Sequence, residues 1–273
     1  MENVMNNNNT LSLAIMSGKG GVGKTNIALN LGYALHQAKM KAILMDCDLG
    51  LANLDVLLGI SPERNLRDLL QTGVNAEDVV VAIENGFDML PATSGIPELV
   101  EMDEDMQDIL FKKLVLLAGS YDFLMLDLGA GISHTVLSFA ELSQLRIVVV
   151  TPEPTSMTDS YAMIKVLVTQ HQVKDFLIVV NQATNANEAN QTFERLAAAC
   201  KNFLDIDLMN LGFVHQDQTL VESVRRQTPL MKFAPDAPAS KDIRGLAKKI
   251  MRYREDNLER IAGRPILKNF PSE

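Results

Sequence analysis

A glycine-rich segment near the amino terminus limits the folds open to this chain more than any other feature. Residues 18–25 read Gly-Lys-Gly-Gly-Val-Gly-Lys-Thr and match the pattern G-x-x-x-x-G-K-S/T. Such a segment works between a strand and a helix, and it is flanked here by an apolar run over Leu11–Ser17 and a helical pattern over Asn26–His36. Glycines let successive backbone N–H groups turn toward phosphate oxygens at the start of a helix. The segment therefore predicts a phosphate-binding loop.

The last residues of this loop predict the ligand. Lys24 is placed to reach the β- and γ-phosphates of a nucleotide, and the Thr25 hydroxyl to bind Mg²⁺. An accidental glycine-rich turn is the alternative, and the pattern would arise by chance in about one chain in a hundred of this length. The pattern favours a P-loop NTPase with ATP and Mg²⁺ as cofactors. The expected nucleotide-binding residues of the loop are Gly18, Gly20, Gly21, Val22, Gly23, Lys24, Thr25 and Asn26.

Carboxylates at the ends of two predicted strands support this interpretation. Asp127 closes the apolar run 123–126, and Asp46 and Asp48 follow the run 42–45 in the same way. Ligands of open α/β sheets bind at the carboxyl ends of strands, and Asp127 takes the Walker B position. An aspartate at a strand end is as often a turn or cap residue, but beside a phosphate loop it favours handling of magnesium and water. The expected metal-contacting residues are Thr25, Asp46 and Asp127.

Short apolar runs alternate with longer helical patterns along the whole chain. This alternation predicts a doubly wound, mostly parallel sheet flanked by helices. The expected strands are Leu11–Ser17, Lys41–Asp46, Phe87–Leu90, Tyr121–Asp127, Arg146–Thr151, Phe176–Asn181 and Asp207–Val214. The expected helices are Asn26–His36, Met106–Leu117, Ser156–Gln170, Glu188–Lys201, Gln218–Arg226 and Ser240–Ile261. We expect one domain over residues 11–262, between a flexible segment at 1–10 and a tail at 263–273.

Composition excludes some classes of protein. A net charge of −9 and a pI near 5.0 disfavour a nucleic acid as direct partner. No window holds 18 uninterrupted apolar residues, and the first ten residues lack the basic and apolar parts of a secretory signal. Cys47 and Cys200 lie far apart in the sequence, which suits a reducing compartment and not a metal cluster. We therefore expect a cytoplasmic protein.

The phosphate loop resembles that of a known family. Lys19 precedes the usual glycines, as in the deviant Walker A loop of the MinD/ParA ATPases. The resemblance implies that ATP brings two copies face to face and that Lys19 then reaches the phosphates of the partner, as an arginine finger does. Residues 46–55 are similar to the switch I segment of the family, which implies that Asp48 positions or activates the attacking water. The expected catalytic residues are Lys19, Lys24 and Asp48.

Two more residues are expected to contact the nucleotide only because of this resemblance. Asn181 ends a predicted strand and matches the asparagine that contacts adenine in the family. Asp217 lies in the segment that closes over adenine and ribose in family members. Either residue is also typical of a simple cap or turn.

Within the family, the chain is similar to the FlhG/FleN group over about residues 11–249. The similarity is carried by residues 50–59, 127–133, 153–165 and 223–230, followed by Pro-Ala-Ser at 238–240. It implies a regulator of flagellar number and placement that acts on a FleQ-like transcription activator or on an FlhF-like GTPase. The amino terminus has no Asp-Gln-Ala-type motif of the kind with which many FlhG proteins stimulate FlhF. FleN-type members that act on a transcription activator lack this motif too.

Other functions remain open at this point. A MinD-type division-site ATPase or a ParA-type positioning ATPase would use the same loop, with a membrane or the nucleoid as its matrix. The acidic charge argues against the nucleoid. An iron–sulfur ATPase would need cysteines around the Walker B strand, and a metabolic kinase would need a substrate domain that the pattern does not contain.

The last predicted helix has one apolar face surrounded by lysine and arginine. Such a face either packs on the core or lies on an anionic bilayer. We expect core packing, with membrane association at the inner membrane or a cell pole as the alternative. The apolar residues are Ile243, Leu246, Ala247, Ile250 and Met251.

Overall fold

The computed structural model describes residues 9–48, 54–71, 73–91 and 104–268. Its described strands form a single eight-stranded sheet in the order β3-β4-β2-β5-β1-β6-β7-β8. All neighbouring strands are parallel except β3 and β4, which pair antiparallel at one edge. The strands are β1 (Leu11–Ser17), β2 (Ala42–Cys47), β3 (Val81–Glu84), β4 (Phe87–Leu90), β5 (Phe123–Ala130), β6 (Leu145–Val150), β7 (Phe176–Ala183) and β8 (Met209–His215).

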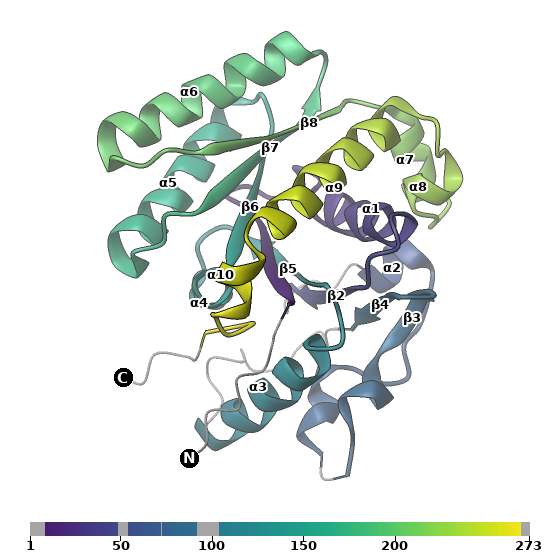
Figure 1. Ribbon diagram of the computed structural model, residues 1–273. Coiled ribbons are helices and arrows are strands. Elements are labelled where there is room, and N and C mark those ends of the chain that lie inside the picture. Colours follow the sequence, from purple (N-terminus) through teal and green to yellow (C-terminus); the bar gives the residue numbers. More distant parts are fainter. Residues whose placement is uncertain (1–8, 49–53, 72, 92–103, 269–273) are drawn as a thin grey trace.

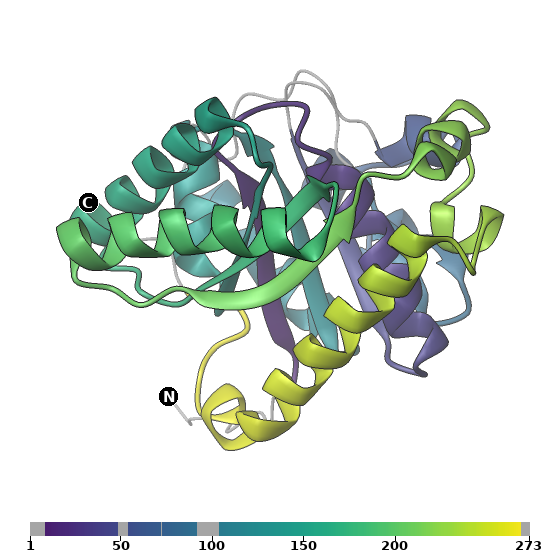
Figure 2. The same cartoon turned by 90° about the horizontal axis from the view of Figure 1, so that it is seen from above.

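Helices cover both faces of this sheet (Figures 1 and 2). One face is covered by α1 (Lys24–Gln37), α8 (Leu230–Phe233) and α9 (Pro238–Asp256). The other is covered by α3 (Glu104–Ala118), α4 (His134–Leu142), α5 (Pro154–His171) and α6 (Ala186–Leu204). The remaining helices are α2 (Leu54–Leu58), α7 (Gln218–Arg225), α10 (Leu258–Ala262) and two 3₁₀ helices at Leu66–Leu70 and Ala76–Val79. The predicted doubly wound α/β fold is confirmed.

The central strands are buried on both faces, which explains their continuous apolar sequences. Every residue of β1, β2 and β6 is buried, and each of these strands is covered by helices on both sides. All seven predicted strands are present, and their bounds differ from the predicted ones by at most a few residues. The carboxyl ends of β1, β2 and β5 consequently meet at one edge of the sheet.

The sequence patterns missed several short elements. Helix α4 is only nine residues long, and seven of these residues are buried, so its sequence reads as a short apolar run. Strand β3 is only four residues long and lies at the sheet edge. The predicted helix Ser240–Ile261 is in fact two helices that meet at Asn257.

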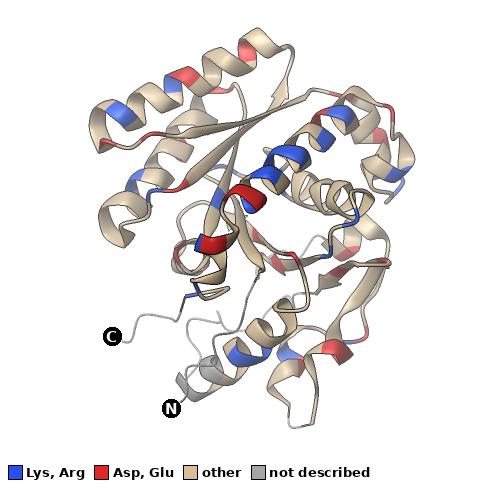
Figure 3. Ribbon diagram, viewed as in Figure 1, with Lys and Arg blue, Asp and Glu red and all other residues tan. Residues whose placement is uncertain are grey.

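The apolar face of α9 is packed on the core, as expected. Ile243, Leu246 and Ile250 are buried against β8 and α1, and Arg254 is buried at the end of the helix. Lysine and arginine lie along the outer surface of α9 (Figure 3). The apolar face is therefore not available to a bilayer. Across the described ranges, no helix combines the length and the apolarity needed to cross a membrane.

The segment after α10 also contacts the core. Ile266 and Leu267 are buried, and the Ser12 hydroxyl donates to the Ile266 carbonyl at 2.5 Å. The backbone N–H of Lys268 donates to the Leu142 carbonyl at 2.9 Å. We therefore propose that the domain extends to about residue 268 and not only to 262. The sequence did not predict this because the two apolar residues follow a proline and form no periodic pattern.

Candidate nucleotide-binding site

The predicted phosphate loop joins β1 to α1 and borders a cavity of about 340 Å³. This volume is within the range of about 300–1,000 Å³ found for small-molecule sites. The wall includes residues 20–26 of the loop, Asp48 from the end of β2, and Ala130 from the end of β5. Every predicted loop residue except Gly18 thus lines a single cavity.

Two glycines of the loop are required by its backbone and its neighbours. Gly23 has φ +86°, and a Cβ atom there would lie 2.4 Å from the Asn181 amide nitrogen. Gly18 contacts α5 so closely that a Cβ atom would lie 2.3 Å from the carbonyl carbon of Asp159. Gly18 therefore fixes the loop against α5 and does not line the cavity.

The substitution Gly18→Ala should destabilise the fold by about 1–3 kcal/mol or more, because the added methyl group meets backbone atoms that cannot rotate away. Urea unfolding would measure the change. Gly20→Ala is the matched control, since a Cβ atom there has nothing within 4 Å and φ is not positive. Equal stability of the two variants would contradict this account of Gly18.

A buried ion pair forms one wall of the site. Lys24 Nζ lies 2.8 Å from Asp127 Oδ1, and their side chains are only 8% and 1% exposed. The Thr25 hydroxyl also hydrogen-bonds to Asp127. Burial raises the pKa of Asp127, although the hydrogen bonds from Lys24 and Thr25 oppose that rise. The structure thus brings together the three predicted residues that would contact phosphate and magnesium.

Asp46 and Asp48 lie beside this ion pair. Asp46 is buried and pairs with Asp127 in the register of β2 and β5. Its two carboxylate oxygens accept from the N–H of Asp48 at 3.0 Å and of Leu54 at 3.3 Å. Asp46 therefore ties the backbone of Asp48 to that of Leu54. Residues 49–53 lie outside the described part of the chain. Its contact with a metal ion stays a prediction, as does the action of Asp48 on water.

Lys19 has a partner within its own chain. Its Nζ lies 2.5 Å from Glu153 Oε2 and 3.1 Å from the Thr155 hydroxyl, both at the start of α5. Glu153 is the N-cap residue of α5 and precedes Pro154, and no sequence pattern indicated that it would contact the loop. In a single chain, the lysine expected to act across a dimer is thus held by Glu153.

Asn181 and Asp217 have structural contacts of their own. The Asn181 amide donates to the Val22 carbonyl at 2.7 Å and so supports the loop. Asp217 accepts from the N–H of Thr219 at 2.8 Å and from that of Ala239 at 3.2 Å. Burial alone would raise the pKa of Asp217, but these hydrogen bonds hold it below its usual value. Contacts of either residue with adenine or ribose stay predictions.

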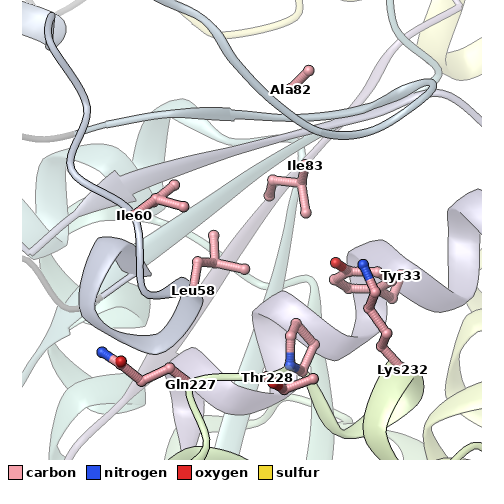
Figure 4. Close-up of a pocket in the computed structure, with 9 residues that line it drawn as sticks. Tyr33, Leu58, Ile60, Ala82, Ile83, Gln227, Thr228 and Lys232 are labelled. Carbon is pink, nitrogen blue, oxygen red and sulfur yellow. The ribbon is translucent and has the colours of Figure 1, made fainter.

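Helix α2 separates this cavity from a second one of about 220 Å³ (Figure 4). Val56 and Leu57 line the nucleotide cavity. Leu58, on the same short helix, lines the second cavity together with Ile83 and Tyr33, and these side chains converge from α2, β3 and α1. A movement of α2 would therefore alter both cavities.

Within the described ranges, no three His, Cys, Asp or Glu side chains form a group that could hold a metal ion. Mg²⁺ is usually held by one or two carboxylates together with substrate phosphates and water. Cys47 and Cys200 are both free thiols, buried in β2 and α6. Neither thiol is near a second cysteine with which it could share a cluster.

Comparison with known proteins identifies the family. A family model described as "Cellulose biosynthesis protein BcsQ" matches residues 11–251. The antiactivator FleN of Pseudomonas aeruginosa is 35% identical over 87% of this chain and 85% of its own length. The flagellum site-determining protein YlxH of Helicobacter pylori is 34% identical over 89% and 82%. The septum site-determining protein MinD of Pyrococcus horikoshii, solved with Mg-ADP, superposes with a TM-score of 0.71 at 25% identity and covers 89% of this chain and 97% of its own. The chain therefore belongs to the MinD/ParA family of P-loop ATPases, in which it resembles the FleN/FlhG flagellar regulators.

Proposed function

We propose that this protein is an ATP-driven switch that regulates the number and placement of flagella by binding a protein partner in its ATP state. One observation carries the proposal. Lys24, Thr25 and Asp48 line a single cavity, and Asp127 is bonded to Lys24 and Thr25, in a chain that is 35% identical to an antiactivator, FleN. The activity is regulatory, because the described fold contains no second domain for another substrate.

The chain is an ATPase that uses ATP and Mg²⁺. The residues of the site fit these cofactors, because the Lys24–Asp127 pair buries one cation and one anion beside the loop. On nucleotide binding, Lys24 would exchange Asp127 for phosphate oxygens, and Thr25 and Asp127 would hold the metal ion. Bound Mg²⁺ neutralises charge on the phosphates. Because Lys24 and Asp127 neutralise each other beforehand, neither charge is buried alone before the nucleotide binds.

Hydrolysis depends on residues from two chains in this proposal. Asp48 would orient the attacking water and accept its proton, while Asp46 fixes the backbone of Asp48 through its hydrogen bond. Lys19 of one chain would leave Glu153 and contact the phosphates bound by the other chain. Loss of the γ-phosphate contacts would release the homodimer, and so the nucleotide would shift the population between two states.

The substitution Glu153→Gln tests the switching of Lys19. Both side chains are partly exposed, so each ion pair contributes at most about 1 kcal/mol. The dimer breaks one pair in each chain, so their loss should favour the dimer by about 2- to 30-fold. Analytical ultracentrifugation with a non-hydrolysable ATP analogue would measure this. Glu255→Gln removes the same charge from the exposed end of α9 and is the control. If the Glu153→Gln protein forms a weaker or unchanged dimer, the Lys19–Glu153 contact within one chain does not compete with dimer formation.

The partner is proposed to be a flagellar transcription activator of the FleQ type, with an FlhF-like GTPase as the other candidate. Similarity to an antiactivator supports the first. Association with the inner membrane or a cell pole would need a surface other than the apolar face of α9, which is buried.

Deletion of the gene in its own host tests the cellular role. We expect extra or misplaced flagella in cells of normal length, counted by electron microscopy. Minicells or filaments with normal flagella would overturn the flagellar proposal. They would support the second candidate, a MinD-type division-site ATPase, which the structural likeness to MinD favours.

A further inference from the structure

A cavity of about 390 Å³ lies at the edge of the sheet opposite the nucleotide site. It is formed where the amino ends of β6 and β7 meet the segment between α5 and β7 and the segment after α10. Four cationic side chains line it, together with a single carboxylate, that of Asp175. The cations are Arg146, Lys174, Arg264 and Lys268. The excess of positive charge is local, because the whole chain carries −9.

Three of these cations form no direct ion pair in the described part of the chain. Lys174, Arg264 and Lys268 are exposed, and none forms a side-chain hydrogen bond or an ion pair with any described residue. By contrast, Lys24 and Lys232, which line other cavities, each form an ion pair, with Asp127 and Glu84 respectively. Like charges gathered without partners repel one another, so an anion that binds among them would relieve this repulsion.

Arg146 gives the cavity a rigid wall. It is 3% exposed, and its Nε and Nη2 atoms donate to the carbonyls of Ala140, Glu141 and Ser143 at the end of α4. Its Nη1 atom has no hydrogen-bond partner in the described part of the chain. Burial lowers the pKa of Arg146 to about 10, so it remains charged at neutral pH. The guanidinium is thus fixed in place with one donor nitrogen unused.

We propose that this cavity is a second anion site that binds a soluble phosphate-type ligand of the size of pyrophosphate. Arginine and lysine are the side chains that bind phosphate oxygens, and a fixed guanidinium adds directional donors. The site is separate from the phosphate loop, because the two lie at opposite ends of the parallel strands. Binding there would join residues 264–268 to β6 and β7 through a shared ligand.

Isothermal titration with inorganic pyrophosphate tests the proposal, without Mg²⁺ and at fixed ionic strength. The starting protein carries Lys24→Met/Asp127→Asn, which removes both charges of the buried pair, so that the phosphate loop contributes little. We expect about one pyrophosphate to bind per chain. Adding Lys174→Ala and Lys268→Ala should weaken this binding by about tenfold or more, because two charge-assisted contacts are lost. The matched control adds Lys241→Ala and Lys248→Ala, two exposed lysines of α9 outside the cavity.

Three results would overturn the proposal. The first is an absence of binding in the Lys24→Met/Asp127→Asn protein, when circular dichroism shows that it is folded. The second is an equal loss of affinity in the two double-lysine variants, which would indicate only an effect of net charge. The third is co-sedimentation with phosphatidylglycerol vesicles that depends on Lys174 and Lys268 while pyrophosphate does not bind, which would assign the cations to a membrane surface. None of these results bears on the ATPase, whose residues lie at the other edge of the sheet.

Discussion

Replacing Lys24 with alanine is expected to lower the affinity for ATP by about 100-fold or more, because two or more charge-assisted hydrogen bonds to phosphate are lost. Lys24 lines the nucleotide cavity and is directed toward Asp127, where the phosphates and the metal ion would meet. Equilibrium titration with a fluorescent ATP analogue would measure the loss. Wild-type affinity in a folded Lys24→Ala protein would refute the assignment of the phosphate loop.

The same substitution leaves Asp127 buried without its cation. Breaking a buried ion pair by removing one partner costs about 3–5 kcal/mol, so lost binding has to be separated from lost stability. The variant Lys24→Met/Asp127→Asn removes both charges and provides this separation. It should regain much of the stability in urea unfolding, but it should still fail to bind ATP, because neither the phosphate nor the metal contact is restored.

Stability of the Lys24→Ala variant should also depend on pH in a defined direction. Without Lys24, the pKa of Asp127 should rise further, because burial already raises it and one opposing contact is gone. A carboxyl group with a higher pKa in the folded state binds protons more readily there than in the unfolded chain, so stability falls as the pH rises between the two pKa values. The loss of unfolding free energy in Lys24→Ala, relative to wild type, should therefore become smaller as the pH is lowered from 7 to 5. A loss that becomes larger as the pH is lowered would contradict the assignment to Asp127.

Replacing Asp48 with alanine should lower the rate of ATP hydrolysis by about 100-fold or more while ATP still binds. Asp48 lines the cavity but is not part of the Lys24–Asp127 pair, so its loss should leave the phosphate contacts in place. The dimer should then persist in ATP. Phosphate release and light scattering would measure the two effects.

Asp55→Ala is the matched control for Asp48→Ala. It removes the same charge from α2, outside the nucleotide cavity. Its hydrolysis rate should stay within about twofold of wild type, as expected for a carboxylate that does not touch the reacting groups. A monomeric Asp48→Ala protein in ATP would count against the dimer scheme.

The sequence predicted the centre of the site because its signals are local. The loop combines fixed residues with a strand before it and a helix after it, and Asp127 is found by its place at the end of an apolar run. In a parallel sheet the carboxyl ends of the strands lie at one edge, so residues at these ends come together once the fold is known. The prediction of a doubly wound fold succeeded for the same reason, since β-runs and helical patterns alternate along most of the chain.

Contacts between distant segments could not be predicted in this way. Lys19 and Glu153 are 134 residues apart, and no periodic pattern relates them. The sequence around Asp217 and Asp46 fits a ligand contact as well as a backbone cap. The structure shows that both carboxylates accept hydrogen bonds from backbone N–H groups. The cavity around Arg146 joins three separate segments, so its concentration of charge is invisible in an acidic composition.

The position of β1 in the middle of the sheet has a consequence for biosynthesis. β1 leaves the ribosome before β5 and β6, with which it pairs and whose residues follow it by more than a hundred positions. At about 5–20 residues per second, this apolar strand waits on the order of 10 s for its neighbours. During that time it is a segment that chaperones would bind. Since Asp127 arrives with β5, the nascent chain would acquire its nucleotide site only after β5 has been made.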